Sequence, residues 1–127
     1  MMNTRRQPIQ ISVETEYLEN QSQPDKHRYA FAYHITISNT GSRAAQLIAR
    51  HWIITDGNQE QQEVHGMGVV GEQPLIHPGD SFQYTSGVVL ETPIGTMEGS
   101  YQLVNDAKEA FEAPISPFLL SVPNVLH

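Results

Sequence analysis

The sequence predicts an all-β protein, built as an antiparallel sandwich or barrel of about seven or eight strands. Val, Ile, Thr, Phe, Tyr and Trp number 37 of the 127 residues, against 16 for Ala and Leu. β-Branched and aromatic side chains fit a pleated surface better than a helix. Alternating segments are separated by turn residues, and six of the eight prolines follow residue 73, which leaves little room for a long helix.

The first half of the chain has the clearest strands. Apolar and polar residues alternate over residues 9–17 and again over residues 28–38, the pattern of half-buried strands. The nearly apolar segment 44–55 permits a helix in its first part, but its β-branched end favours a strand. The turn at 56–58 then predicts a hairpin with a short polar strand at 59–64.

The second half predicts shorter elements. No repeat or linker interrupts them, so we expect a single domain over residues 9–127, preceded by a flexible lead-in at residues 1–8. A glycine-rich stretch at 65–74 and a turn at 77–80 come first, with a loop at 92–95. Strands are expected at residues 81–86, 100–105, 109–113 and 117–122.

The composition excludes several classes of protein. Without cysteine, the chain has no disulfide framework, thiolate zinc site or cysteine nucleophile. A net charge of −7 argues against broad nucleic-acid binding. No apolar run is long enough for membrane insertion, and Arg5-Arg6 lacks the apolar stretch of an export signal. We therefore expect a soluble, cytoplasmic protein.

The string Gly66-Met67-Gly68-Val69-Val70-Gly71 matches the dinucleotide-binding pattern G-x-G-x-x-G. That motif works at the start of a helix, and Pro74, Pro78 and Gly79 deny one here. Two interpretations stay open. The backbone N–H groups could form an anion-binding nest, which Glu72 would oppose, or the glycines could serve a loop that needs positive φ or close backbone approach.

The remaining polar residues give no catalytic signature. The six histidines lack helical or finger-type ligand spacing, although a sheet can bring distant residues together, so metal ligands are left undetermined. His34 should face solvent, and His51 should be a hydrogen-bonded core or rim histidine. No Gly-x-Ser-x-Gly elbow supports a hydrolase. Glu91 and Glu98 could pair as acid and base, but a solvated acidic face is favoured. We expect a non-enzymatic protein without a cofactor.

Several strings, in order along nearly the whole chain, resemble the ApaG family. They are residues 13–18 (VETEYL), 31–37 (FAYHITI), 50–56 (RHWIITD), 68–74 (GVVGEQP), 78–87 (PGDSFQYTSG) and 92–101 (TPIGTMEGSY). The resemblance, to a stand-alone bacterial member, implies an immunoglobulin- or fibronectin-III-like β-sandwich. It also implies a binding role, because the same domain occurs in an F-box protein and a polymerase-delta-interacting protein. In bacteria it implies a link to cobalt resistance and magnesium efflux.

Two hypotheses of function follow. The first is a binding module for an unidentified protein partner, as a monomer or as a homodimer paired through an edge strand. Its surface would combine Arg50, His51 and Trp52 with the loops 66–74 and 92–99, including Gly66, Gly68, Gly71, Glu72, Met97 and Glu98. The alternative is a small-ligand module that holds phosphate, pyrophosphate or a divalent cation through the loop at residues 66–71.

Overall fold

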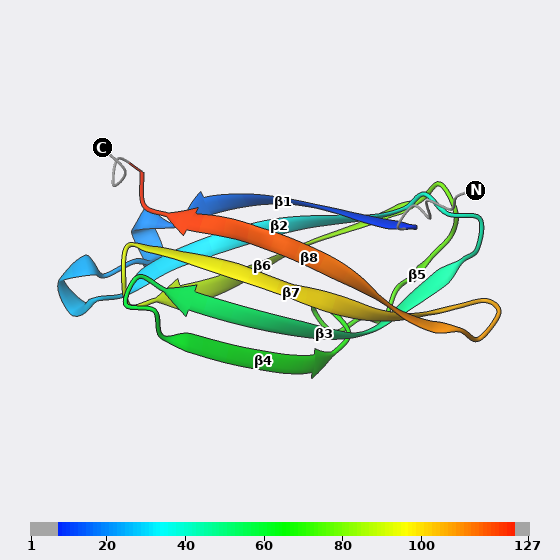
Figure 1. The fold of residues 1–127 in the computed structure, drawn as a ribbon. Coiled ribbons are helices and arrows are strands. Elements are labelled where there is room, and N and C mark those ends of the chain that lie inside the picture. The colour runs from blue at the N-terminus through cyan, green and yellow to red at the C-terminus, as the bar shows by residue number, and fades with distance from the viewer. Residues whose placement is uncertain (1–7, 124–127) are drawn as a thin grey trace, which may run out of the picture.

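The computed structural model describes residues 8–123 and consists of two antiparallel sheets packed face to face (Figure 1), which confirms the predicted β-sandwich. The smaller sheet has the strand order β1-β2-β6. The larger has the order β4-β3-β7-β8, with β5 also pairing β3. The strands are β1 (Ile9–Tyr17), β2 (Tyr29–Asn39), β3 (Ala45–Asp56), β4 (Gln61–Met67), β5 (Leu75–Ile76), β6 (Ser81–Leu90), β7 (Ile94–Asn105) and β8 (Ala110–Ser121).

The N-terminal alternation correctly predicts the first two strands. Ile9 pairs with Asn39 and Tyr17 with Phe31, so β1 and β2 form one long antiparallel ladder. Residues 1–7, most of the predicted lead-in, lie outside the described residues. Pro8 is bound to the fold, because its carbonyl oxygen accepts the Thr40 amide at 2.8 Å.

The segment 44–55 forms strand β3 and no helix. β3 lies inside the larger sheet, between β4 and β7, and its β-branched residues fit that position. A register shift between Leu47 and Ala49 marks a bulge. Because a bulge adds one residue, the buried side of β3 changes there from odd-numbered to even-numbered positions.

The two strands predicted at 109–113 and 117–122 are one strand, β8. The sequence prediction separated them because Pro114 and Pro117 cannot donate to a ladder. β8 is an edge strand, so one side of it needs no donors, and Pro117 lies where the register with β7 shifts. The two prolines are therefore tolerated without a break.

Other predicted boundaries were wrong in detail. The expected loop 92–99 is mostly strand, because β7 already begins at Ile94, and β6 continues to Leu90. β5 was not predicted. The polar loop after β1 contains two short 3-10 turns, Glu19–Gln21 and Pro24–Lys26. None of the described helices is long and apolar enough to cross a membrane.

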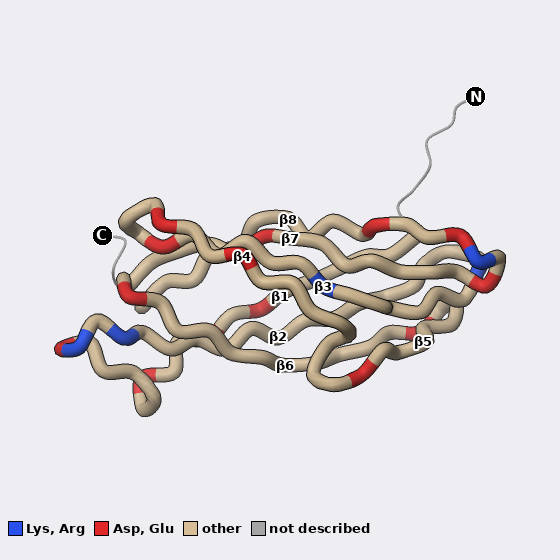
Figure 2. The backbone as a smooth tube through the Cα atoms, turned by 90° about the horizontal axis from the view of Figure 1, so that it is seen from below, with Lys and Arg blue, Asp and Glu red and all other residues tan. Residues whose placement is uncertain are grey.

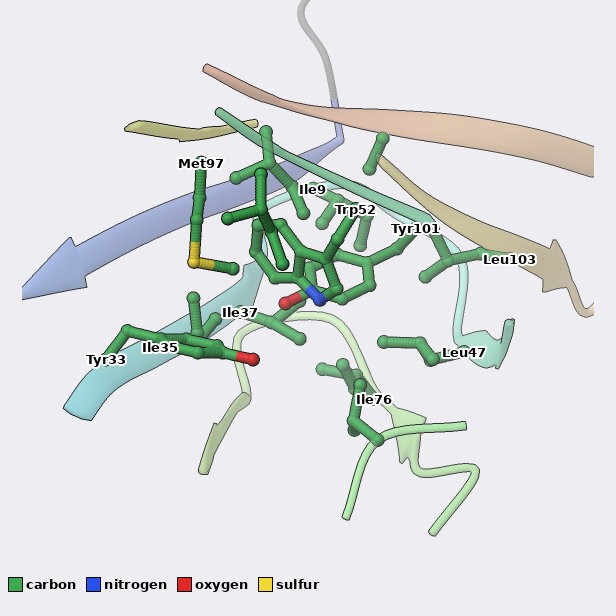
Figure 3. Packing of buried hydrophobic residues seen from close by; sticks show 14 of the residues in the cluster. Ile9, Tyr33, Ile35, Ile37, Leu47, Trp52, Ile76, Met97, Tyr101 and Leu103 are labelled. Atoms are coloured by element: carbon green, nitrogen blue, oxygen red, sulfur yellow. The ribbon is translucent and has the colours of Figure 1, made fainter. Parts of the chain in front are cut away.

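The core lies between the sheets and is centred on Trp52 (Figure 3). Its ring meets those of Tyr33, Phe118 and Tyr101 nearly edge-on, at centroid distances of 5.5, 5.8 and 6.3 Å. Edge-to-face pairs are favourable beyond the area they bury. Trp52 thus ties strands of both sheets together, since Tyr33 belongs to β2 and Tyr101 to β7.

Candidate functional site

The string Arg50-His51-Trp52 does not form one surface, because successive side chains of a strand point to opposite faces. Arg50 and Trp52 point into the sandwich. His51 points to the outer face of the larger sheet, which is the face turned away from the smaller sheet. Glu98 also points to this outer face, because it pairs in register with Ile53. Of the residues predicted to make a contact surface, His51 and Glu98 thus share a face that Arg50 does not.

Trp52 and Met97 are corrections to the predicted surface. Trp52 is 3% exposed and Met97 is 1% exposed, and both belong to the core cluster. Met97 pairs in register with Ile54, another inward residue. Because the predicted loop 92–99 is strand β7, alternation buries Met97 and leaves only its neighbours outside. Neither side chain is available to a partner.

Arg50 holds the end of β4 in place from inside the sandwich. Its Nη1 donates to the carbonyl oxygens of Met67 at 3.1 Å and Gly68 at 2.9 Å. Gly66 lies opposite Arg50 in the register, and a Cβ there would be 2.6 Å from Arg50 Cζ. The glycine at position 66 therefore provides the space for the guanidinium.

Beside Arg50 lies a pair of tyrosines that sequence reasoning missed, the half-buried Tyr84 and the buried Tyr101. The hydroxyls of Tyr84 on β6 and Tyr101 on β7 are 2.5 Å apart, so the bond joins the two sheets. Burial raises the pKa of Tyr84 to about 12, and burial also raises the pKa of Tyr101. Arg50 opposes both shifts, since its positive charge favours phenolate. Both phenols stay protonated at neutral pH.

The glycine motif forms a tight turn and opens no helix. Val69 and Glu72 exchange N–H···O bonds of 2.8 and 2.9 Å, and both central residues, Val70 and Gly71, have positive φ. This is the geometry of a type I′ hairpin turn. Gly68 also has positive φ, and a Cβ there would lie 2.4 Å from the Glu72 carbonyl oxygen. The dinucleotide-binding interpretation is thus rejected on geometry, as the sequence predicted.

The amides of this loop are largely used within the protein. Gly68 donates to Ile48 O at 2.7 Å, and Val69 and Glu72 donate to each other. The Gln73 side chain adds a bond to Ile48 O at 2.9 Å. An anion nest needs a run of convergent free N–H groups. With three amides committed and the Glu72 carboxylate adjacent, the geometry does not favour a phosphate site.

What the loop does present is apolar. Met67, Val70 and Leu75 are 68%, 52% and 55% exposed, the three largest values among the exposed large hydrophobic residues of the described chain. Met67 lies opposite Ala49 and Leu75 opposite Gln46, so both flank β3 on the same edge of the larger sheet. Val70 stands at the turn between them. We call these three residues the apolar edge.

One cluster of potential metal ligands lies on the outer face. His51 Nε2 is 2.7 Å from Glu63 Oε2, and His65 Nε2 is 3.6 Å from the same oxygen. The two imidazole rings stack at 4.1 Å. Sequence reasoning singled out His51 alone. The predicted hairpin turn could have shown that His65 lies beside His51, because a hairpin centred on residue 58 places position 51 opposite position 65.

Other polar features serve the fold. Asp56, Glu60 and Glu91 lie close together, but Asp56 Oδ1 already accepts the amides of Asn58 and Glu60 and so shapes the β3–β4 turn. His34 is half-exposed between Glu16 and Thr85, consistent with its predicted outward position. A cavity of about 740 Å³ near Ile9 is lined by none of the predicted site residues.

Within residues 8–123, the basic residues form no continuous patch. Figure 2 shows them in loops at the two ends of the sandwich and at one position on β3, with acidic positions interspersed. The position on β3 is Arg50, whose guanidinium is engaged inside the fold.

The fold and its surface define a small antiparallel β-sandwich module with one apolar edge. A family model described as the ApaG domain matches residues 19–105. Protein ApaG of Azoarcus sp. strain BH72 is 58% identical over 119 residues, which cover 94% of each chain. That of Thiobacillus denitrificans is 55% identical over the full length of both chains. The chain belongs to the ApaG family.

A solved structure agrees with this assignment. The crystal structure of the putative ApaA protein from Bordetella pertussis is 53% identical in sequence and superposes with a TM-score of 0.89. The match covers 91% of this chain and 94% of that one. The sandwich described above is therefore similar to one determined by experiment.

Proposed function

We propose that the protein is a non-enzymatic binding module, related to the fibronectin type III modules, that docks a protein partner on the apolar edge. The observation that carries this proposal is the exposure of Met67, Val70 and Leu75 together at one edge of a rigid sandwich. Exposed apolar residues grouped in this way mark interaction sites more often than isolated ones.

The apolar edge is pre-organised for binding. Arg50 and Ile48 fix the backbone on both sides of Gly68, and Leu47 N donates to Pro74 O at 3.0 Å. Val70 has a positive φ, which is a strained conformation for a β-branched residue. Such strain persists only where the surrounding structure holds the backbone in place. A surface already held in its bound shape loses less entropy on association.

Charge indicates the kind of partner surface. Glu63 on β4 and Glu72 at the Val69–Glu72 turn lie near the apolar edge, on a chain with a net charge of −7. The fitting partner therefore presents apolar side chains within a basic rim, since complementary charge steers association. The same charge and the dispersed basic residues argue against broad nucleic-acid binding.

The non-enzymatic part of the proposal has separate support. The pKa shifts resolved within residues 8–123 fall on Tyr84 and Tyr101, which are bonded to each other and held protonated. Catalytic acids and bases are instead tuned toward the working pH. A cytoplasmic location fits a chain without cysteine. The protein would then affect cobalt resistance and magnesium efflux, the expected cellular roles, through its partner.

The test is a matched pair of double variants used as bait. Met67→Ser with Leu75→Ser removes the apolar edge. Val89→Ser with Leu119→Ser removes two exposed apolar side chains elsewhere, 48% and 45% exposed. We expect a partner captured by the wild type to be lost with the first variant and kept with the second. Equal capture by both variants would contradict docking on the apolar edge.

A further inference from the structure

We propose that His51, Glu63 and His65 form a binding site for one divalent first-row transition metal ion of the Zn²⁺ class on the outer face of the larger sheet. The site adjoins the apolar edge, since Met67 follows His65 by two residues on β4. The inference does not rest on the docking proposal, because it is argued from the geometry of three polar side chains in the β3–β4 ladder.

The backbone register brings the three ligands together. His51 and His65 are directly opposite each other in the β3–β4 ladder, and Glu63 precedes His65 by two residues on the same face. One ligand atom from each residue lies within 4.8 Å of the others. Because an antiparallel ladder fixes these positions, the ligands need only side-chain rotations to close on an ion.

The distances are close to those of a coordination sphere. Zn²⁺ binds imidazole nitrogen and carboxylate oxygen at about 2.0–2.2 Å, so ligand atoms of a tetrahedral site stand about 3.3 Å apart. The Glu63 oxygen is 2.7 Å from His51 Nε2 and 3.6 Å from His65 Nε2. These two separations bracket the tetrahedral value.

The ligand types and the local charge determine the metal class. Two imidazoles and one carboxylate suit Zn²⁺, Cu²⁺ or Ni²⁺, whereas Mg²⁺ prefers oxygen and water. Among the described residues, the ion pairs of Glu63 are with His51 and His65, and no Lys or Arg pairs with it. The carboxylate is therefore available to a cation.

A metal ion bound here would link the edge strand β4 to its neighbour β3. β4 is the outermost strand of the larger sheet and pairs only with β3 among the described strands. With three protein ligands on an open face, at least one coordination position is left for water or an outside ligand.

The test is titration of the full chain with Zn²⁺ by calorimetry at neutral pH. We expect one Zn²⁺ per chain, with affinity reduced at least about tenfold in His65→Ala and in Glu63→Gln. Losing only an outer-shell partner of a ligand already costs about 10–100-fold, and each of these variants removes a ligand itself. His65 is 70% exposed in its side chain, so its replacement leaves the core intact. The control is His34→Ala, which breaks a similar exposed contact, to Glu16 at 3.3 Å, outside the cluster.

Proton NMR of the imidazoles gives a second measurement. Zn²⁺ should shift the ring signals of His51 and His65 and leave those of His34 unchanged, while Mg²⁺ at the same concentration should shift none of them. Three results would overturn the proposal: no uptake at millimolar Zn²⁺, uptake undiminished in both ligand variants, or an equal loss in His34→Ala.

Discussion

Replacing Gly66 with alanine should destabilise the protein by displacing the Arg50 guanidinium. The new Cβ would lie 2.6 Å from Arg50 Cζ and 2.7 Å from both terminal nitrogens, so the side chain has to move. Movement breaks the bonds from Nη1 to the carbonyls of Met67 and Gly68. Hydrogen bonds from a charged donor contribute about 1.5–3 kcal/mol, one nitrogen makes both of these, and the one to Met67 is exposed. Because alanine itself gains about 0.5–1 kcal/mol over glycine in a strand, we expect a net loss of about 1–2 kcal/mol.

Urea unfolding followed by the fluorescence of Trp52, the single tryptophan, measures this loss. A double-mutant cycle with Arg50→Ala shows whether the guanidinium causes this loss. Without the guanidinium the alanine has space, and because alanine is favoured over glycine in a strand, Gly66→Ala should then be neutral or stabilising by about 0.5–1 kcal/mol. The same destabilisation in both backgrounds would show that Arg50 is not the reason for the glycine.

Two further predictions concern the glycine loop and the tyrosine pair. Gly68→Ala should cost clearly more unfolding free energy than Gly71→Ala, because a Cβ at 68 meets a backbone oxygen at 2.4 Å while one at 71 meets nothing within 4 Å. Gly71→Ala should cost only the left-handed penalty of about 1–2 kcal/mol, and equal losses in the same urea assay would contradict this. The free energy of unfolding should also fall as pH rises from about 10 toward 12. Tyrosines of the unfolded chain lose their protons near pH 10. In the folded protein, burial raises the pKa of Tyr84 to about 12 and also raises that of Tyr101, so high pH favours the unfolded state. Tyr84→Phe should make this fall shallower over the same range, and an unchanged slope would contradict the assigned cause.

The sandwich could be predicted because most strands carry the period-two pattern in their own residues. Residues 9–17 alternate so regularly that one buried face is evident, and β1 has those bounds. The errors arose where position in the sheet decides. A proline would interrupt a strand inside a sheet, but Pro114 and Pro117 are tolerated in β8 because β8 lies at the edge. The bulge at Leu47/Ala49 changes which residues of β3 face inward.

The candidate site was less predictable because it depends on pairing between segments. Arg50, His51 and Trp52 are adjacent in the chain, yet alternation sends His51 outward and its two neighbours inward. Glu63 and His65 can be recognised as potential metal ligands beside His51 only once β4 is paired with β3 in the observed register. Likewise, Tyr84 and Tyr101 meet across two sheets, a contact that no local pattern encodes.

Photo-cross-linking from the apolar edge shows whether this edge docks a protein. A photoreactive amino acid replaces Met67 in one variant and Val89 in another, within the full chain in cells that produce it. Both positions are exposed, at 68% and 48%, so neither substitution disturbs the core. We expect a discrete cross-linked protein species from position 67 and none from position 89. The same species from both positions, or none from position 67, would contradict it.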